Sequence, residues 1–227
     1  MRKFSFCILL ISLGYNIAIA QRFKAGLLGG VSANDVAGTN TRGCFHKVGI
    51  LFGGLVNAEL SKKNSLQFEI NYAQKGSLQR PDSLNMGYFN LYLNYIEVPV
   101  LFKRQIHFML WKKPMDRICI EGGASVSRLF SFKMRGEDNY DLSISESMFN
   151  KTLANVFVGL DFNFTPNFYF CFRYNNSVIP AVKRNALDWQ FIRYTYNQGN
   201  NQNFQFTFKY VFGNFNQSQS EMPPKTE

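Results

Sequence analysis

Apolar and polar residues alternate along most of this chain with a period of two. The stretch 94–103 is the clearest example, and its apolar positions are Ile96, Val98, Val100 and Phe102. Tyr95, Glu97 and Lys103 lie at the positions between and beside them. Because successive side chains of a β-strand point to opposite faces, this pattern predicts a strand with one apolar and one charged face. Helical periodicity is weak elsewhere, so we expect an all-β protein.

Seven further segments show the same alternation. The eight predicted strands cover residues 22–34, 47–60, 65–76, 94–103, 117–134, 155–164, 168–175 and 203–212. The connections after the second and sixth strands are tight turns by composition, Ser61-Lys62-Lys63-Asn64 and Thr165-Pro166-Asn167. A moderate link, 105–116, follows the fourth strand, and longer loops cover 35–46, 77–92, 135–154 and 178–202.

Short connections thus alternate with long ones, as in bacterial outer-membrane barrels with short periplasmic turns and longer outer loops. An even number of strands also returns both termini to the same side. The pattern therefore predicts an eight-stranded antiparallel up-and-down transmembrane β-barrel.

A secreted soluble barrel of the lipocalin type, binding an apolar ligand, has the same periodicity and is the main alternative. Glycine is frequent on the polar face, which suits a crowded interior, and that face carries both charge signs. Aromatic residues lie on the apolar face near the strand ends, as in the girdles of membrane barrels. They are Tyr72, Phe130 and Phe132 at the outer ends, and Phe102, Phe164, Phe168, Tyr210 and Phe212 at the inner ends. These features favour the membrane barrel.

The polar face predicts a charge network inside the barrel. Its members are Lys24, Glu59, Glu69, Lys75, Glu97, Lys103, Glu121, Lys133, Asp161, Arg173 and Lys209. Eight strands leave an interior only wide enough for side chains, so these charges should pair. We expect Glu97 and Glu121 to anchor the pairing, and the lumen to be plugged rather than an open channel. Tyr95, Leu28, Leu51 and Leu55 share the inward face.

Two residues depart from the pattern. Pro99 removes a ladder donor inside a strand, which predicts a bulge or locally broken pairing. Arg128 falls on the apolar face, where it either reaches the outer headgroups or is turned inward by a bulge near Gly122 and Gly123. The sequence leaves both orientations open.

The first 20 residues predict a secretory signal peptide. Arg2 and Lys3 precede a short apolar run, and Ala18-Ile19-Ala20 precedes Gln21, the expected cleavage point. Residues 21–213 then form the barrel domain, and 214–227 form a polar tail. The cleaved chain keeps a net charge of +8 of the original +10, which favours outer-membrane lipids and lipopolysaccharide as partners over nucleic acid.

Catalytic and cofactor motifs are absent from the sequence, so we expect no enzyme activity, cofactor or metal. A membrane-barrel hydrolase would need His46 together with Asp35 or Asp138, and His107 lies in a link at the other end. Glu137, Asp138 and Asp141 could bridge a divalent ion but more commonly form a solvated acidic loop.

Three cysteines follow the predicted signal. Cys119 and Cys171 face inward with one strand between them, a separation of about 9–10 Å that is too long for a disulfide. We therefore expect these two and Cys44 to be free thiols.

Three segments carry a family resemblance. They are SLQFEINYAQKGS at 65–77, LNYIEVPVLFK at 93–103 and NFQFTFKYVF at 203–212. These resemble the PorT-like outer-membrane β-barrel family of Bacteroidetes, and the resemblance extends over the mature chain. It implies an eight-stranded outer-membrane barrel, and a link to protein secretion with envelope or secretion-machine proteins as partners. Function would then be structural, accessory or mediated by loops that bind.

Overall fold

The computed structural model describes residues 22–37, 45–81, 88–110, 113–136, 146–183 and 199–212, with the backbone alone at 22, 107–110 and 113–116. The predicted signal peptide, the polar tail and Cys44 lie outside these residues. So do Glu137, Asp138 and Asp141. Among the described residues, no helix has the length and apolar character needed to cross a bilayer.

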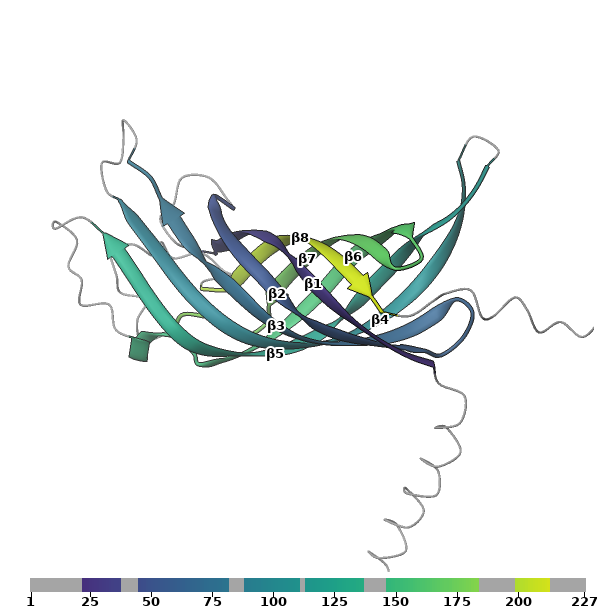
Figure 1. Ribbon diagram of the computed structural model, residues 1–227. Coiled ribbons are helices and arrows are strands. Elements are labelled where there is room, and N and C mark those ends of the chain that lie inside the picture. The colour runs from purple at the N-terminus through teal and green to yellow at the C-terminus, as the bar shows by residue number, and fades with distance from the viewer. Residues whose placement is uncertain are drawn as a thin grey trace, which may run out of the picture.

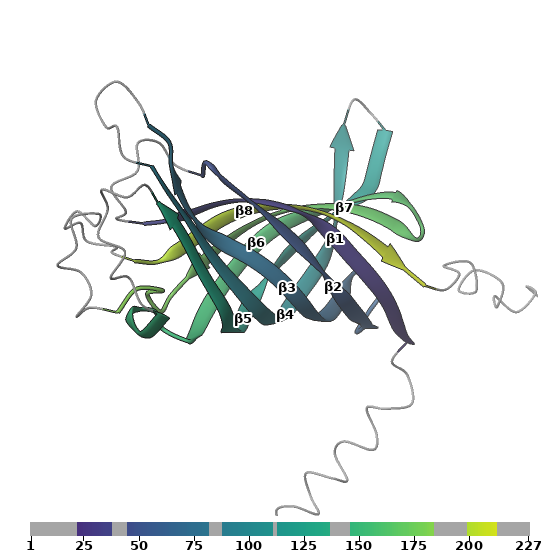
Figure 2. The ribbon, with the colours of Figure 1, turned by 60° about the vertical axis from the view of Figure 1, so that its left-hand side comes forward.

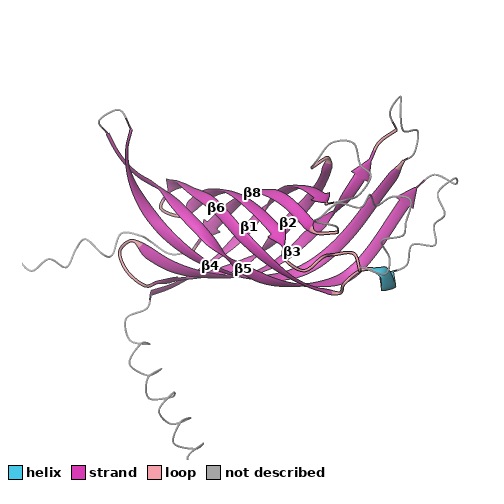
Figure 3. Ribbon diagram, turned by 180° about the vertical axis from the view of Figure 1, so that it is seen from behind, coloured by secondary structure: helices cyan, strands magenta, loops and turns pink. Residues whose placement is uncertain are grey.

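Eight antiparallel strands form one closed barrel (Figure 1), in which each strand pairs with the next and β8 pairs with β1. The strands are β1 Arg22–Val36, β2 Lys47–Glu59, β3 Asn64–Gln79, β4 Phe89–Leu110, β5 Lys113–Gly136, β6 Thr152–Thr165, β7 Phe168–Ser177 and β8 Asn201–Val211. A short 3-10 helix, η1 Glu146–Met148, lies between β5 and β6 (Figure 3). This architecture confirms the predicted eight-stranded fold.

The two ends of the barrel differ. One end, called here the terminal end, holds the start of β1 and the end of β8 (Figure 1). Its turns are tight, and in one of them the backbone amide of Asn64 donates to Ser61 Oγ at 3.1 Å. The opposite end, called the loop end, holds the end of β1, the start of β8 and η1.

The predicted link 105–116 is wrong, because most of it is strand. β4 and β5 stay paired as far as Leu110 and Lys113, although β3 ends its pairing with β4 at Asn64 and Arg104. The two strands therefore project from the terminal end as a hairpin (Figure 2). Antiparallel strands pair through backbone hydrogen bonds whatever side chains they carry, so the residue pattern does not reveal this hairpin.

Burial fixes which face of the sheet points outward. Val98, Ile70 and Val158 are 47%, 60% and 57% exposed on the wall. Glu97 and Asp161, on the opposite face of β4 and β6, are 0% exposed. A water-soluble barrel would bury the first set and expose the second. The secreted lipocalin-like alternative is therefore wrong.

The pairing is irregular beside Pro99 and at Phe130, whereas β4 and β5 stay in regular register at Gly122 and Gly123, so the bulge considered there is absent from these described residues. β3 and β4 pair at Phe68–Val100 and at Asn71–Glu97 but not between, beside Pro99, so the predicted break is confirmed. In β5, the partner of Tyr95 is Leu129 and the partner of Asn94 is Ser131. Phe130 is therefore an extra residue, a β-bulge that reverses the facing of all later positions of β5.

Aromatic side chains gather near the boundaries of the apolar wall. At the loop end, the Phe52 and Tyr72 ring centroids lie 4.9 Å apart, and those of Tyr72 and Phe130 lie 5.8 Å apart. Phe164 and Phe168 lie 6.3 Å apart at the terminal end. The outward facing predicted for Phe132 is wrong: the bulge turns it inward, and its ring lies 5.0 Å from that of Phe149.

The loop end of the interior is apolar, which the sequence pattern did not indicate. We call this the loop-end cluster; its buried members are Val36, Phe89, Leu91, Leu93, Tyr95, Leu129, Phe149, Leu153, Ala181 and Val182. Phe149 and Val182 come from the connections and form a β-bridge to each other. Segments of two connections thus close over the loop end. A smaller apolar cluster contains Leu28, Leu51 and Leu55, which face inward as predicted.

Candidate functional site: the charged interior of the barrel

Glu121 lies at the centre of the buried charges. Its Oε1 accepts a hydrogen bond from Arg173 Nε at 2.5 Å and one from the Cys171 thiol at 3.1 Å. Its other oxygen accepts from Lys209 Nζ at 3.0 Å. The carboxylate thus joins β5, β7 and β8 across the lumen, in the anchoring position predicted for it.

Arg173 connects this centre to β3. Its two terminal nitrogens donate to the two oxygens of Glu69 at 3.0 and 3.1 Å, a bidentate pair. Glu69 also accepts from the amides of Gln67 and Asn71, at 2.5 and 2.7 Å. All these side chains are essentially inaccessible to water.

Asp161 completes the set toward the terminal end. Lys209 Nζ lies 2.9 and 3.2 Å from its two oxygens, and Lys103 also pairs with it. We call Glu69, Lys103, Glu121, Asp161, Arg173 and Lys209 the central network. Three cations face three anions, so the network is neutral as a whole, as a lumen of low dielectric requires.

Glu97 anchors a second group nearer the loop end. Its Oε1 accepts from Lys75 Nζ at 3.0 Å, Ser125 Oγ at 2.9 Å and Asn155 Nδ2 at 2.8 Å. Asn155 also donates to the hydroxyl of Ser127 at 3.0 Å. β3, β4, β5 and β6 are thereby connected above the central network.

The remaining predicted members lie outside these groups. Lys24 and Glu59 pair with each other at the terminal end, where both are partly exposed. Lys133 is exposed on the outer wall, so its predicted inward position is wrong. The bulge at Phe130 is the cause, because it reverses the facing of the positions that follow. Arg128, left open by the sequence, is exposed and lies before the bulge, and its guanidinium donates to Thr152 Oγ1 at 2.7 Å.

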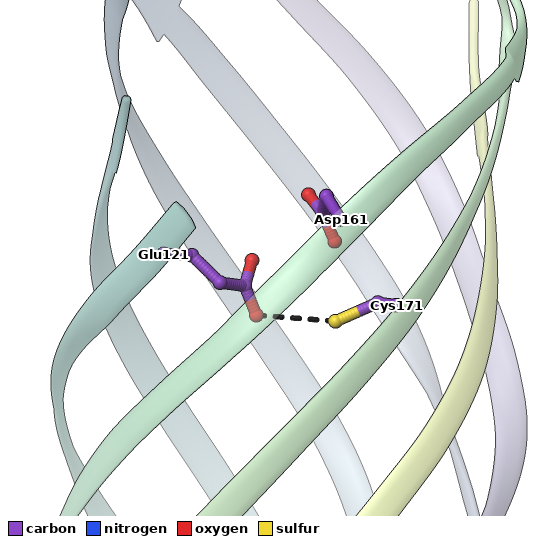
Figure 4. Close-up of side chains that lie close together, drawn as sticks. All are labelled: Glu121, Asp161 and Cys171. Atoms are coloured by element: carbon purple, nitrogen blue, oxygen red, sulfur yellow. Dashed lines mark hydrogen bonds between the residues drawn. The ribbon is translucent and has the colours of Figure 1, made fainter. Parts of the chain in front are cut away.

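Three of the buried groups have the makings of a metal site. Glu121, Asp161 and Cys171 offer ligand atoms that all lie within 4.8 Å of one another (Figure 4). The same carboxylate oxygens are, however, bonded to Arg173, Lys209 and Lys103. A cation placed there would have to displace three ammonium or guanidinium groups in a buried space. The chemistry of the donor set therefore favours an ion-pair lattice over a metal site.

His46 is exposed at the loop end and interacts electrostatically with Asp35, one of its two proposed partners. Among the described residues no hydrogen bond joins these two side chains, and the Asp35 carboxylate instead accepts one from Ser77 at 3.4 Å. The other proposed partner, Asp138, and the His107 side chain lie outside the described part. Cys119 and Cys171 are both free, as predicted.

Comparison with known families agrees with this geometry. Residues 18–182 match the family model described as outer membrane protein beta-barrel domain. The chain belongs to this family. It is accordingly an integral protein of the outer membrane, surrounded by outer-membrane lipids and lipopolysaccharide. Tight turns, which this barrel has at its terminal end, are typical of the periplasmic end of such barrels.

Solved structures similar to this outer-membrane barrel share little sequence with it. Neisserial surface protein A is 13% identical, with 85% of this chain and 99% of that chain covered and a TM-score of 0.46. Ail of Yersinia pestis, in complex with the heparin analogue sucrose octasulfate, is 14% identical, with 85% and 97% covered and a TM-score of 0.41. No curated protein matches the chain.

Proposed function

We propose that this outer-membrane barrel is non-enzymatic and has no open channel, and that it acts through its two ends and its wall. The single observation that carries the proposal is the filling of the lumen. Ion-paired side chains fill its middle, and the loop-end cluster closes the loop end. Such a barrel serves as a membrane-anchored support for binding segments.

The two fillings close the lumen by different means. Ions entering the central network would have to break pairs such as Arg173–Glu121, whose members are 2% and 0% exposed. Ions approaching from the loop end would meet Leu93, Tyr95 and Leu153, each 0% exposed. Neither layer offers the hydrated path that a general porin requires.

Conductance in planar bilayers tests this proposal. We expect the full-length protein, inserted in its folded form, to give no steady current in 1 M salt, while a porin in the same bilayer serves as the positive control. A reproducible open level of porin size would overturn the proposal. A variant that narrows the lumen, such as Gly53→Trp, is unsuitable as a control in this experiment. A Cβ at Gly53 would lie 2.2 Å from Asn71 Oδ1 and from the carbonyl oxygen of Ile70, so the substitution would disturb the fold itself.

The projecting β4–β5 hairpin supports an accessory role at the periplasmic end. Beyond Gln105 and Ile118 no other strand of the described part pairs with the hairpin, so both of its edges carry backbone groups open to strand addition. Our proposal is that this hairpin contacts another envelope protein. The resemblance to PorT-like proteins favours a partner in protein secretion.

Shortening the hairpin tests this role without touching the barrel. A variant that joins residue 105 to residue 118 by a two-residue Asn-Gly turn should fold and lose its cross-linked periplasmic partners in intact cells. A matched variant with Asn-Gly in place of Lys62-Lys63 in the neighbouring β2–β3 turn should keep them. Equal cross-linking by both variants would contradict the proposed contact.

A further inference from the structure

The outward face of β5 carries three cations at the loop end. Arg128, Lys133 and Arg135 are all exposed. Arg128 is opposite Ile96, whereas Lys133 and Arg135 are opposite Tyr92 and Asn90 on the outer face of β4. The bulge at Phe130 brings the three to one side of the sheet, since without it Lys133 and Arg135 would face the lumen.

The depth of Arg128 follows from the strand. Ile118 is the residue at which the pairing of β5 with β6 begins, and Arg128 lies ten positions beyond it. Between them, the outward-facing Ile120 and Val126 are 46% and 58% exposed. At about 3.3 Å per residue and a tilt of about 40°, ten positions rise about 25 Å, the height of the apolar band of a membrane barrel. The rings of Tyr72 and Phe130 lie beside it as an interfacial belt. Arg128 thus lies where hydrocarbon gives way to headgroups.

The other two cations lie farther out. Phe130 is an extra residue, so Lys133 and Arg135 lie only four and six positions of β4 beyond Arg128. By the same geometry they rise roughly 10 and 15 Å above it. The headgroup layer of a phospholipid leaflet is only about 5–8 Å thick, so a phospholipid at Arg128 does not reach them. A single lipid that contacts all three cations must therefore place its acyl chains along the wall and carry anionic groups on a long polar headgroup.

Arg128 is also held in place for such a ligand. Its bond to Thr152 uses one N–H group, and a guanidinium has five. The nearby Lys151 is paired with Glu146 at 3.1 Å, so its charge is already matched. Arginine suits this role because its planar fork binds phosphate through two hydrogen bonds.

We infer that Arg128, Lys133 and Arg135 form a binding site for the phosphorylated saccharide of an outer-leaflet lipopolysaccharide. Arg128 binds a phosphate at the acyl-chain boundary, and Lys133 and Arg135 bind anionic groups farther along the saccharide. The bulge is the structural device that creates the site. The site is independent of whether the lumen conducts, so the conductance experiment and the test below can fail separately.

Binding to the purified, folded full chain in neutral detergent tests the site. Lipopolysaccharide, phosphatidylglycerol and inorganic phosphate are titrated separately against wild type and the triple variant Arg128→Gln, Lys133→Gln, Arg135→Gln. We expect the triple variant to bind lipopolysaccharide at least about tenfold more weakly, because it loses the charge-assisted hydrogen bonds of all three cations to the anionic groups of the ligand. The matched control, Lys62→Gln, Lys63→Gln, Arg104→Gln, removes three exposed cations from the terminal end and should stay within twofold of wild type.

The double variant Lys133→Gln, Arg135→Gln separates the ligands. It should weaken lipopolysaccharide binding and leave phosphatidylglycerol binding within twofold. Equal losses from the triple variant and its terminal-end control would overturn the site in favour of general charge attraction. Displacement of lipopolysaccharide by millimolar inorganic phosphate would overturn the lipid assignment. Heat-modifiable gel mobility confirms folding, and Arg135→Gln alone serves if the triple variant does not insert.

Discussion

The middle of the barrel interior and its loop end are filled in opposite ways. The central network places Arg173 and Lys209 among three carboxylates, and nearly every oxygen of these carboxylates has a partner. The loop-end cluster buries Leu93, Phe149 and Leu153, whose side chains carry no polar groups that need partners. Charges tolerate burial only with specific partners, whereas apolar side chains require only the exclusion of water. The first region should therefore fail when one partner is lost, and the second in proportion to the volume removed.

Removing Glu121 should produce the largest loss. Glu121→Ala leaves Arg173 and Lys209 without a carboxylate that both of them contact, and breaking a buried pair costs about 3–5 kcal/mol. Urea titrations of folding into lipid vesicles measure the free energy of unfolding. Glu59→Ala, at the partly exposed terminal-end pair, is the matched control and should cost under about 1 kcal/mol. Equal losses of unfolding free energy at the two sites would contradict the expectation that breaking a buried ion pair costs more stability than breaking a partly exposed one.

Truncation in the loop-end cluster should be graded by size. Leu93→Ala removes a fully buried side chain and should cost about 2–5 kcal/mol, with Leu93→Met costing less than about 1.5 kcal/mol. The same vesicle titrations apply. If the two substitutions lowered the free energy of unfolding equally, the cluster would depend on shape-specific contacts rather than on filled volume. That result would contradict the difference expected between the cluster and the central network.

A charge on the outer wall should cost according to depth. Val98→Arg lies in the middle of β4 and should cost roughly 2–4 kcal/mol, whereas Val48→Arg at the loop end of β2 should cost about 0–1 kcal/mol. The alternation alone would predict only a small loss of stability for Gln67→Arg, because Gln67 faces the polar interior. The structure predicts a larger loss, because the Gln67 amide donates to Glu69 and accepts from Lys103. Matching costs for Val98→Arg and Val48→Arg would contradict the placement of the apolar band.

The alternation of residues predicted the strands and the facing of most charges, because period two is visible without knowledge of neighbours. Lys133 and Phe132 were placed wrongly, since the bulge at Phe130 lies in Leu129-Phe130-Ser131, where no glycine or proline marks it. The pairing of Arg173 with Glu69 joins residues 104 positions apart and depends on how the strands are staggered on closure. Phe149 and Val182 lie in segments that composition assigns to outer loops, so their part in the interior could not be predicted.

A double-mutant cycle on Glu69 and Arg173 tests most directly whether the charges in the middle hold one another. Glu69→Gln, Arg173→Met and the double variant are compared with wild type in folding titrations. Because the pair is buried and bidentate, we expect the double variant to be more stable than the sum of the single losses by at least about 1.5 kcal/mol. Single losses that add within about 0.5 kcal/mol would show that the two residues act independently and would contradict the paired interior.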